Sequence, residues 1–231
     1  MFGQPRIHVP ECESTQLLLD PALPEGAVAS TDHQTGGRGR LGRSWDDEPG
    51  AALLFSILLK PPVDRQAAEL SLVAGLATAE SVERAIARPA GLKWPNDVLV
   101  DDRKVAGGLA ELRDGVVVLG IGVNVNQTAE QLPPDTRTAA ASLRTLDGQT
   151  REREALLADL LVTLEDAYRT WLAHGIGALH DRIASRDWLR GREATVGDAS
   201  GEVRGIRPDG RLAVATADGT VLVGSGEVAT L

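Results

Sequence analysis

Three runs of strand-forming residues, separated by very short turns, constrain the fold of this chain more than any other feature. The runs are LKWPNDVLV (92–100), RKVAGGLAEL (103–112) and VVVLGIGVNVN (116–126), and the dipeptides DD and DG interrupt them. Aspartate and glycine favour tight turns, and turns this short join antiparallel neighbours, since parallel strands need a long crossover. The middle of the chain is therefore predicted to form an antiparallel meander.

Helical periodicity marks two further segments. Apolar residues recur at three- and four-residue spacing in residues 65–87 and again in 152–173, and Gly175 follows the second segment as its C-cap. Residues 127–150, rich in Ala, Asp and Thr, are predicted to form a long surface connection. The other apolar runs of the first half are predicted strands, at residues 6–9, 27–31 and 51–60, the last of which would also suit a helix segment.

The pattern changes towards the C-terminus. From Gly191 the short runs EATVG, GEVRGI, RLAVAT, TVLVG and EVATL alternate with the turn sequences DASG, PDG and ADG. Short strands joined by such turns are typical of a small all-β barrel. Because the composition shifts near Arg186, we predict two domains, at residues 1–187 and 188–231.

The composition excludes some kinds of partner. The chain has 231 residues and a formal net charge of −9, which argues against nucleic-acid or membrane binding through the whole surface. Its one cysteine, Cys12, allows no intrachain disulfide and no cysteine-cluster metal site. The N-terminus lacks the apolar core of a signal peptide, and no apolar run reaches the length of a membrane span. We therefore expect a soluble, cytoplasmic protein.

One stretch contrasts with this negative charge. The sequence QTGGRGRLGRSW, residues 34–45 and hereafter the Gly/Arg loop, holds four glycines, three arginines and no acidic residue. Glycine lets a backbone approach a ligand closely, and arginine is a forked donor suited to phosphate or carboxylate. The stretch suits a solvated basic turn, an RGG-like RNA-binding tract, or a phosphate-binding loop. It is no P-loop, since it lacks the Gly-Lys-Ser/Thr ending.

Two later motifs favour the phosphate-binding interpretation. KWPNDVLV places Lys93, Asn96 and Asp97 together, and their side chains suit a nucleotide with its Mg²⁺, although Pro-Asn-Asp also suits a plain turn. KVAGGLAEL begins with Lys104, and its two glycines leave room for a ligand beside the strand. A lysine at a hairpin edge is otherwise commonly a solvated side chain.

These motifs occur together in one known family. GRGRLGRSW, KWPNDV, KVAGGLAEL and GIGVNVN, preceded by EST, resemble the biotin protein ligases in order and spacing, from Ser14 to Asn126, and the C-terminal module fits as well. The resemblance implies an α+β fold, with a mixed sheet and flanking helices similar to class II synthetases at 1–187 and an SH3-like barrel at 188–231. It implies that the chain makes biotinyl-5′-AMP from biotin and ATP. The ATP is expected as its Mg²⁺ complex. Biotin then passes to a lysine of a biotin carboxyl carrier protein.

The resemblance also assigns site residues. Those for biotin are Ser14, Thr15, Gln34, Gly37, Arg38, Arg40, Trp45, Lys104, Gly107 and Gly108. Those for ATP are Arg40, Arg43, Trp45, Lys93, Asn96, Asp97 and Asn124, with Asn96 and Asp97 also expected at Mg²⁺. Arg40 and Lys104 are the expected catalytic residues, because a carboxylate meets a polyphosphate in the first step and nearby cations offset that repulsion.

Members with a DNA-binding repressor domain carry it before the EST motif, where this chain has too few residues for one. It therefore resembles the monofunctional form, expected as a monomer or weak homodimer that does not bind DNA. Three positions depart from the family pattern: Gln16 stands where Asn is commoner, Leu41 replaces a second basic residue, and Gly108 replaces a larger aliphatic residue.

Three alternative functions remain. The nearest is a lipoate-type ligase of the same fold, against which the Gly/Arg loop argues. The others are an RNA-binding protein and a biotin-binding module without catalysis, although the presence of Arg40 and Lys104 argues against the last.

Overall fold

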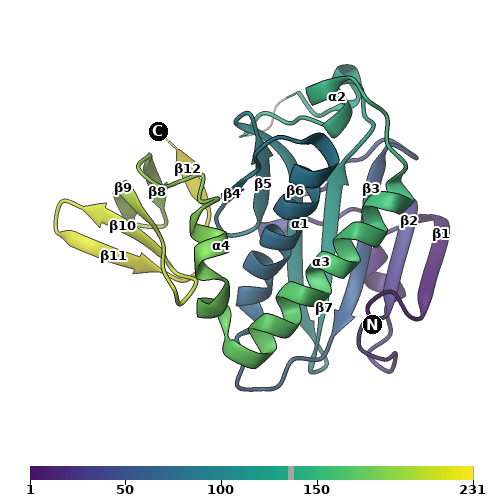
Figure 1. The fold of residues 1–231 in the computed structure, drawn as a ribbon, viewed down its shortest axis with the longest axis horizontal. Coiled ribbons are helices and arrows are strands. Elements are labelled where there is room, and N and C mark those ends of the chain that lie inside the picture. The colour runs from purple at the N-terminus through teal and green to yellow at the C-terminus, as the bar shows by residue number, and fades with distance from the viewer. Residues whose placement is uncertain (135–137, 231) are drawn as a thin grey trace.

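The computed structural model describes residues 1–134 and 138–230, which form two β-sheets and a layer of helices (Figure 1). The larger sheet contains β1 (Arg6–Cys12), β2 (Val28–Gln34), β3 (Ala52–Leu59), β4 (Gly91–Lys93), β5 (Asp97–Val100), β6 (Arg103–Arg113) and β7 (Val116–Asn124). The smaller sheet contains β8 (Glu193–Val196), β9 (Ala199–Ile206), β10 (Leu212–Thr216), β11 (Gly219–Val223) and β12 (Val228–Thr230).

The large sheet is mixed and the small sheet is antiparallel. The large sheet has the order β1-β2-β3-β7-β6-β5-β4, in which β1 and β2 are parallel and the other neighbours are antiparallel. The small sheet has the order β11-β10-β9-β8-β12 and lies beside the β4 edge of the large one (Figure 1). This architecture confirms the predicted α+β class, and the five runs predicted from residue 191 are the five strands of the small sheet.

The predicted meander is present as β4 to β7, with one difference. Residues 92–100 form two strands instead of one, because Pro95 has no backbone N–H for a ladder and the chain turns there, so that Lys93 pairs with Asp97. The dipeptide between β5 and β6 forms the expected tight turn, in which Asp101 and Asp102 both have positive φ angles, of 50° and 58°.

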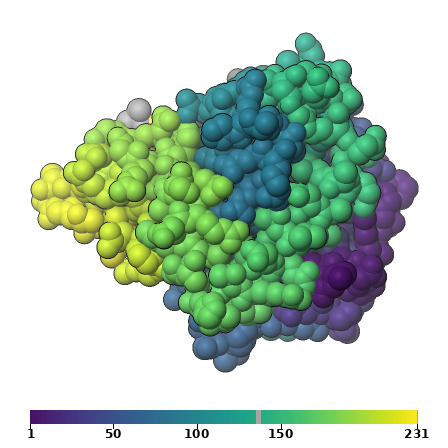
Figure 2. All heavy atoms as spheres, viewed as in Figure 1, coloured from purple at the N-terminus to yellow at the C-terminus, as the bar shows by residue number. Residues whose placement is uncertain are grey.

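Helices cover one face of the large sheet. They are α1 (Leu70–Ile86), α2 (Leu143–Asp147), α3 (Arg153–His174) and α4 (His180–Ala184). The chain also forms single 3₁₀ turns, which do not all lie on this face: η1 (Thr15–Leu18), η2 (Arg40–Gly42), η3 (Ala67–Glu69), η4 (Ala129–Gln131) and η5 (Ile176–Leu179). In the space-filling view, atoms of α1 and α3 form one continuous surface, and α4 lies beside α1 towards the small sheet (Figure 1, Figure 2). Gly175 caps α3 as predicted, with its N–H on the Trp171 carbonyl at 2.8 Å. None of the helices in residues 1–134 and 138–230 is long and apolar enough to span a bilayer.

Strand alternation gives the large sheet two different faces. In the central strands, Phe55, Leu119 and Ile121 are buried in the main core together with α1 and α3. Successive side chains of a strand point to opposite faces, so Gly120 and Gly122 of β7 face away from the helices. These two glycines leave room for other groups above this second face, whereas Leu58 and Val118 of the same face are buried with Leu19 in a second core cluster.

The predicted surface connection at 127–150 is more structured than expected. It contains η4 and α2, and Ala141 and Leu143 have no exposed surface, because apolar residues in this segment complete the core. Its Ala140 forms a β-bridge with Lys104 of β6. Residues 135–137 of this segment lie outside the described residues.

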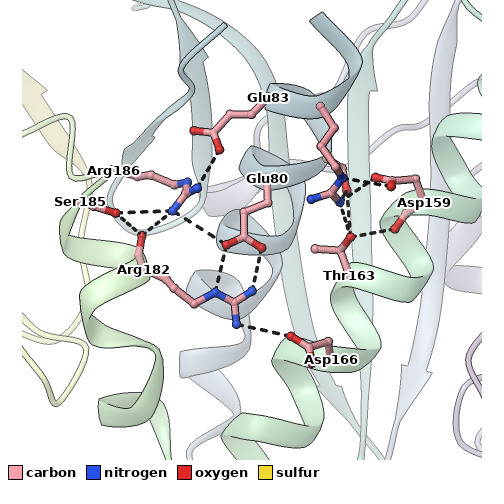
Figure 3. Close-up of polar contacts among 10 residues, drawn as sticks. Glu80, Glu83, Asp159, Thr163, Asp166, Arg182, Ser185 and Arg186 are labelled. Carbon is pink, nitrogen blue, oxygen red and sulfur yellow. Dashed lines mark hydrogen bonds and ion pairs between the residues drawn. The ribbon is translucent and has the colours of Figure 1, made fainter. Parts of the chain in front are cut away.

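Ion pairs connect α4 to the other helices (Figure 3). Arg182 donates to both carboxylate oxygens of Glu80 on α1, at 3.0 and 2.7 Å, and pairs with Asp166 on α3 at 3.4 Å. Arg186, just after α4, pairs with Glu83 at 2.7 Å. Partly exposed pairs add little stability individually. As a set they fix the direction in which the chain leaves α4 for the small sheet.

The packing of α3 on the sheet generates a stability prediction. Leu160 has no exposed surface, whereas Val162 on the same helix is 71% exposed. Leu160→Ala should lower the free energy of unfolding by about 2–5 kcal/mol, because it leaves a cavity in the core. The control Val162→Ala should change it by less than about 0.5 kcal/mol. Urea denaturation followed by circular dichroism measures both, and equal losses would contradict the described orientation of α3.

Candidate active site

A cleft of about 660 Å³ lies on the helix-free face of the large sheet. Its lining brings together segments that are distant in the sequence: the residues at the start of η1, the Gly/Arg loop, the turn between β4 and β5, the glycines of β6 and β7, and the start of β12 in the small sheet. Residues of both sheets thus line the cleft, and the Gly/Arg loop forms a large part of its wall.

Most of the predicted site residues line this cleft. They are Ser14, Thr15, Gln34, Arg38, Arg40, Arg43, Trp45, Lys93, Asn96, Asp97, Lys104, Gly107 and Gly108. Gly37 lies in the loop behind the lining. Asn124 is only 6% exposed, and its amide donates to the Ala141 carbonyl at 3.1 Å and accepts from Gln127 at 3.1 Å. The structure therefore does not place Asn124 in the cleft, because its side chain holds the segment that follows β7.

The Gly/Arg loop forms a small hairpin. Arg38 and Ser44 form a β-bridge, and the Trp45 N–H donates to the Gly37 carbonyl at 2.9 Å. At the tip, Leu41 and Gly42 have positive φ angles of 57° and 74°. A Cβ atom on Gly37 would collide with the Trp45 carbonyl oxygen. Glycine is therefore needed where the two arms of the hairpin cross.

Trp45 lies on a floor made of two glycines. Gly107 of β6 and Gly122 of β7 are direct partners in the sheet, and a Cβ atom on Gly122 would stand 2.5 Å from the Trp45 ring. The Lys104 ammonium lies 5.5 Å from the centre of the same ring, a cation–π distance. The buried indole N–H of Trp45 has no hydrogen-bond partner among the described residues. The floor thus needs glycine on both strands for the indole to lie flat.

Neutral polar groups line one end of the cleft. The side-chain oxygen of Gln34 accepts from the Thr15 N–H at 2.8 Å and from its hydroxyl at 3.2 Å. The Thr15 and Ser56 hydroxyls lie 2.7 Å apart, and Ser14 is 2% exposed beside them. Hydroxyl and amide groups both donate and accept, so this end suits an uncharged polar ring.

Cations line the other end of the cleft. The Lys104 ammonium pairs with Asp97 at 2.8 Å, and Asn96 donates to the same carboxylate oxygen at 3.1 Å. The Asn96 oxygen in turn accepts from Arg40 at 3.3 Å. Burial lowers the pKa of Arg40, although a guanidinium stays charged at physiological pH. A half-buried cation with long hydrogen bonds suits an anionic ligand.

The small sheet also contributes to the cleft. Arg40 donates to the Gly226 carbonyl at 3.2 Å, and Arg43 forms an ion pair with Glu227. Sequence reasoning missed Glu227, because nothing in the C-terminal pattern distinguishes it. It also missed Gly122 as a site residue, although glycines two apart on one strand signal a face open to a ligand.

Known proteins resemble this chain in sequence. The model of the Biotin/lipoate A/B protein ligase family matches residues 10–127. The bifunctional ligase/repressor BirA of Bacillus subtilis is 31% identical over 242 residues, covering 99% of this chain and 74% of that protein. The biotin–[acetyl-CoA-carboxylase] ligase of Mycobacterium tuberculosis is 38% identical over 219 residues, covering 90% and 80% respectively.

The fold has close counterparts among solved structures. The biotin protein ligase from Aquifex aeolicus, in complex with biotin and ATP, superposes with a TM-score of 0.89 at 31% identity and covers 99% of both chains. The apo structure of the same ligase superposes with a TM-score of 0.85 and covers 98% of both chains.

The glycine floor generates a prediction about Trp45. Gly122→Ala should displace the indole, because the new Cβ atom would stand 2.5 Å from its ring. In Gly108→Ala, the nearest described atoms lie 3.7 Å from the new Cβ, so the indole should stay in place. The indole N–H resonances in ¹H–¹⁵N NMR spectra report both outcomes. A Trp45 resonance that keeps its position in Gly122→Ala would contradict the described contact.

Proposed function

The chain belongs to the Biotin/lipoate A/B protein ligase family and has the activity of a biotin protein ligase, and we propose that its cleft holds biotin and ATP end to end. The observation that carries this proposal is the polarity of the cleft, with neutral groups at one end and cations at the other. Biotin has a neutral ureido ring and an anionic carboxylate, and ATP adds further negative charge beside that carboxylate.

The neutral end receives the ureido ring in this proposal. Ser14, Thr15 and Gln34 supply the donors and acceptors that such a ring needs. Trp45 and the glycine floor border the path of the apolar chain of biotin, because an indole and bare backbone offer a flat apolar surface. Arg38 and Lys104 line the same cleft, and in this proposal they bind the carboxylate of biotin.

The first step joins biotin to AMP. A carboxylate oxygen of biotin attacks the α-phosphorus of ATP, a P–O bond forms, and pyrophosphate leaves with the electrons of the broken bond. Both reactants are anions, so cations at the reacting groups lower the barrier. We assign this role to Arg40 and Lys104, with Arg43 and Lys93 on the phosphates. Asn96 and Asp97 orient Arg40 and Lys104 through the hydrogen bonds described above.

The second step transfers biotin to a protein. The neutral amine of a lysine on a biotin carboxyl carrier protein attacks the acyl carbon, and AMP leaves. This step carries less negative charge at the carboxylate, so it needs less help from the cations. The name of the Mycobacterium tuberculosis relative, which specifies an acetyl-CoA carboxylase, supports a carboxylase carrier as the acceptor. Closure of the Gly/Arg loop would keep water from the mixed anhydride.

Mg²⁺ is expected with ATP, where it neutralises phosphate charge. Asp97 offers one carboxylate and Asn96 one amide oxygen, and Mg²⁺ in nucleotide sites commonly uses one or two carboxylates together with phosphates and water. Both oxygens are engaged, by Lys104 and Arg40. Asp97, with Asn96 beside it, would hold a Mg²⁺ that arrives with ATP, and the metal would neutralise phosphate charge there.

The small sheet supports the Gly/Arg loop in this proposal. Its contacts to Arg40 and Arg43 place it against the anionic end of the cleft. We propose that residues 188–231 act as a separate module and 1–187 as the catalytic domain. The junction between them is held to β4, since Trp188 donates to the Leu92 carbonyl at 2.9 Å.

The first prediction from this function concerns the substrate. Biotin should drive exchange of pyrophosphate into ATP, because the ureido ring matches the neutral polar end of the cleft. Lipoate and octanoate lack that ring and should drive little exchange. Radiolabelled pyrophosphate exchange with each acid measures this. Exchange with lipoate but not with biotin would contradict the assignment.

The second prediction concerns Arg40. Arg40→Ala should slow adenylate formation by about 100- to 1000-fold, the effect of removing one preorganised donor from a developing anion. Transfer from pre-made biotinyl-5′-AMP should be affected far less. Arg40→Lys keeps the charge but not the fork, so it should recover only part of the rate. Single-turnover kinetics of the two half-reactions test this, and adenylate formation at the wild-type rate in Arg40→Ala would refute the assigned role.

A further inference from the structure

A partly buried ion pair lies at the base of the Gly/Arg loop, outside the cleft. One carboxylate oxygen of Asp47 lies 2.9 Å from Nδ1 of His33, and the other accepts the backbone N–H of Gln34 at 3.2 Å. The Asp47 side chain has no exposed surface, and that of His33 is 27% exposed. Neither residue lines the cleft, so the roles assigned above do not involve this pair.

The pair joins the two ends of the loop. The chain enters the loop at Gln34, the residue after His33, and leaves it at Trp45, two residues before Asp47. Gln34 turns its side chain into the cleft towards Thr15, while Asp47 holds its backbone N–H. Asp47 therefore fixes a residue at the neutral end of the cleft and lies close in sequence to the indole on the glycine floor.

The energy of the buried carboxylate depends on its partners. An ionised carboxylate without exposed surface is costly unless charge and hydrogen bonds compensate it. Asp47 has a backbone N–H on one oxygen and the imidazole on the other. A protonated His33 supplies a full positive charge, and a neutral His33 supplies only a hydrogen bond, which is weaker. The strength of this clamp therefore depends on the protonation state of one histidine.

We propose that His33 and Asp47 are positioning residues for biotin capture: their ion pair holds the ends of the Gly/Arg loop together, so that Gln34 and Trp45 are in place to receive the ligand. This inference rests on the proposed function, because it names biotin as the ligand. It assigns a role to two residues that touch no substrate and act through their neighbours.

The surroundings of His33 are mainly acidic. Glu11 of β1 is its direct partner in the sheet, and Asp47 and Glu48 lie in the segment between the loop and β3. The hydrogen bond to Asp47, and the negative charges of Asp47, Glu11 and Glu48, raise the pKa of His33 above its ordinary value. Cys12, the β1 partner of Gln34, is also near Asp47. Burial raises the pKa of its thiol, so the thiol stays neutral to a higher pH than an exposed cysteine.

The sign of the pH effect follows from the raised pKa. Below that pKa His33 is charged and the clamp is at full strength. As the pH rises through it, the imidazole loses its proton and the ion pair becomes a neutral hydrogen bond. Affinity for biotin should therefore be highest at low pH and fall as the pH rises. The biotin carboxylate stays ionised throughout, since an ordinary carboxyl has a pKa of about 4.

The test is calorimetric titration of biotin between about pH 6 and about pH 8.5, a range in which histidine is the side chain that ordinarily titrates. The wild-type dissociation constant should rise on the order of tenfold, the effect of weakening one charge-assisted hydrogen bond. His33→Gln should bind weakly at every pH, with a flat profile. Asp47→Asn keeps an acceptor for Gln34 and should also give a flat profile. In steady-state assays, KM for biotin should rise in both variants with little change in kcat.

His8→Gln is the matched control. His8 lies on the neighbouring strand β1 and pairs with Asp32 at 3.6 Å, away from the loop. It should keep the wild-type pH profile. A wild-type affinity that does not change with pH would overturn this inference and leave the proposed function standing. The same pH dependence in His33→Gln as in the wild type would do so as well. So would a lower unfolding temperature in His33→Gln with unchanged biotin affinity. A wild-type protein that binds no biotin at any pH would overturn the proposed function, and this inference with it.

Discussion

The unequal faces of the large sheet determine where everything else in the structure lies. One face carries the large apolar side chains of β3 and β7, and burying them requires the cover of α1 and α3. The other face carries Gly120 and Gly122, which leave room above them for the Gln16 side chain, the Trp45 ring and the cleft. Because successive side chains of a strand point to opposite faces, the same strands line the core on one side and the cleft on the other.

The cleft contains several positively charged side chains that repel one another. Arg40, Arg43 and Lys104 come from two separate segments, and their mutual repulsion must be offset before a ligand arrives. Each of these cations has an acceptor within the protein: the Asn96 and Gly226 oxygens for Arg40, Glu227 for Arg43 and Asp97 for Lys104. A phosphate or carboxylate of the ligand can replace these contacts with stronger ones.

The Gly/Arg loop depends on three supports that come from different parts of the chain. Its own backbone forms the hairpin, Asp47 joins its ends, and the small sheet meets its arginines through Gly226 and Glu227. Because the small sheet follows α4, the ion pairs of that helix with Glu80 and Glu83 also bear on the position of the loop (Figure 3).

Local sequence determined much of this protein. The turn dipeptides and alternating runs predicted β6, β7 and the five strands of the small sheet, because short-range sterics and hydrogen bonds set turns and strands. They predicted one strand where the structure has β4 and β5. Helical period predicted α1 and α3 to within a few residues at either end. The motifs, through their resemblance to a known family, named site residues that nearly all line the cleft, although further residues line it as well.

Only the tertiary structure decided how these parts meet. Asn124 belongs to a predicted motif, yet its amide holds Ala141, a residue in a segment that carries no recognisable pattern. Glu227 and Asp47 are ordinary acidic residues in the sequence, and they matter because the fold places them against Arg43 and His33. Contacts between residues far apart in the chain depend on packing and on the order of strands in the sheet. Propensity and periodicity report only on near neighbours, so they carry no information about such contacts.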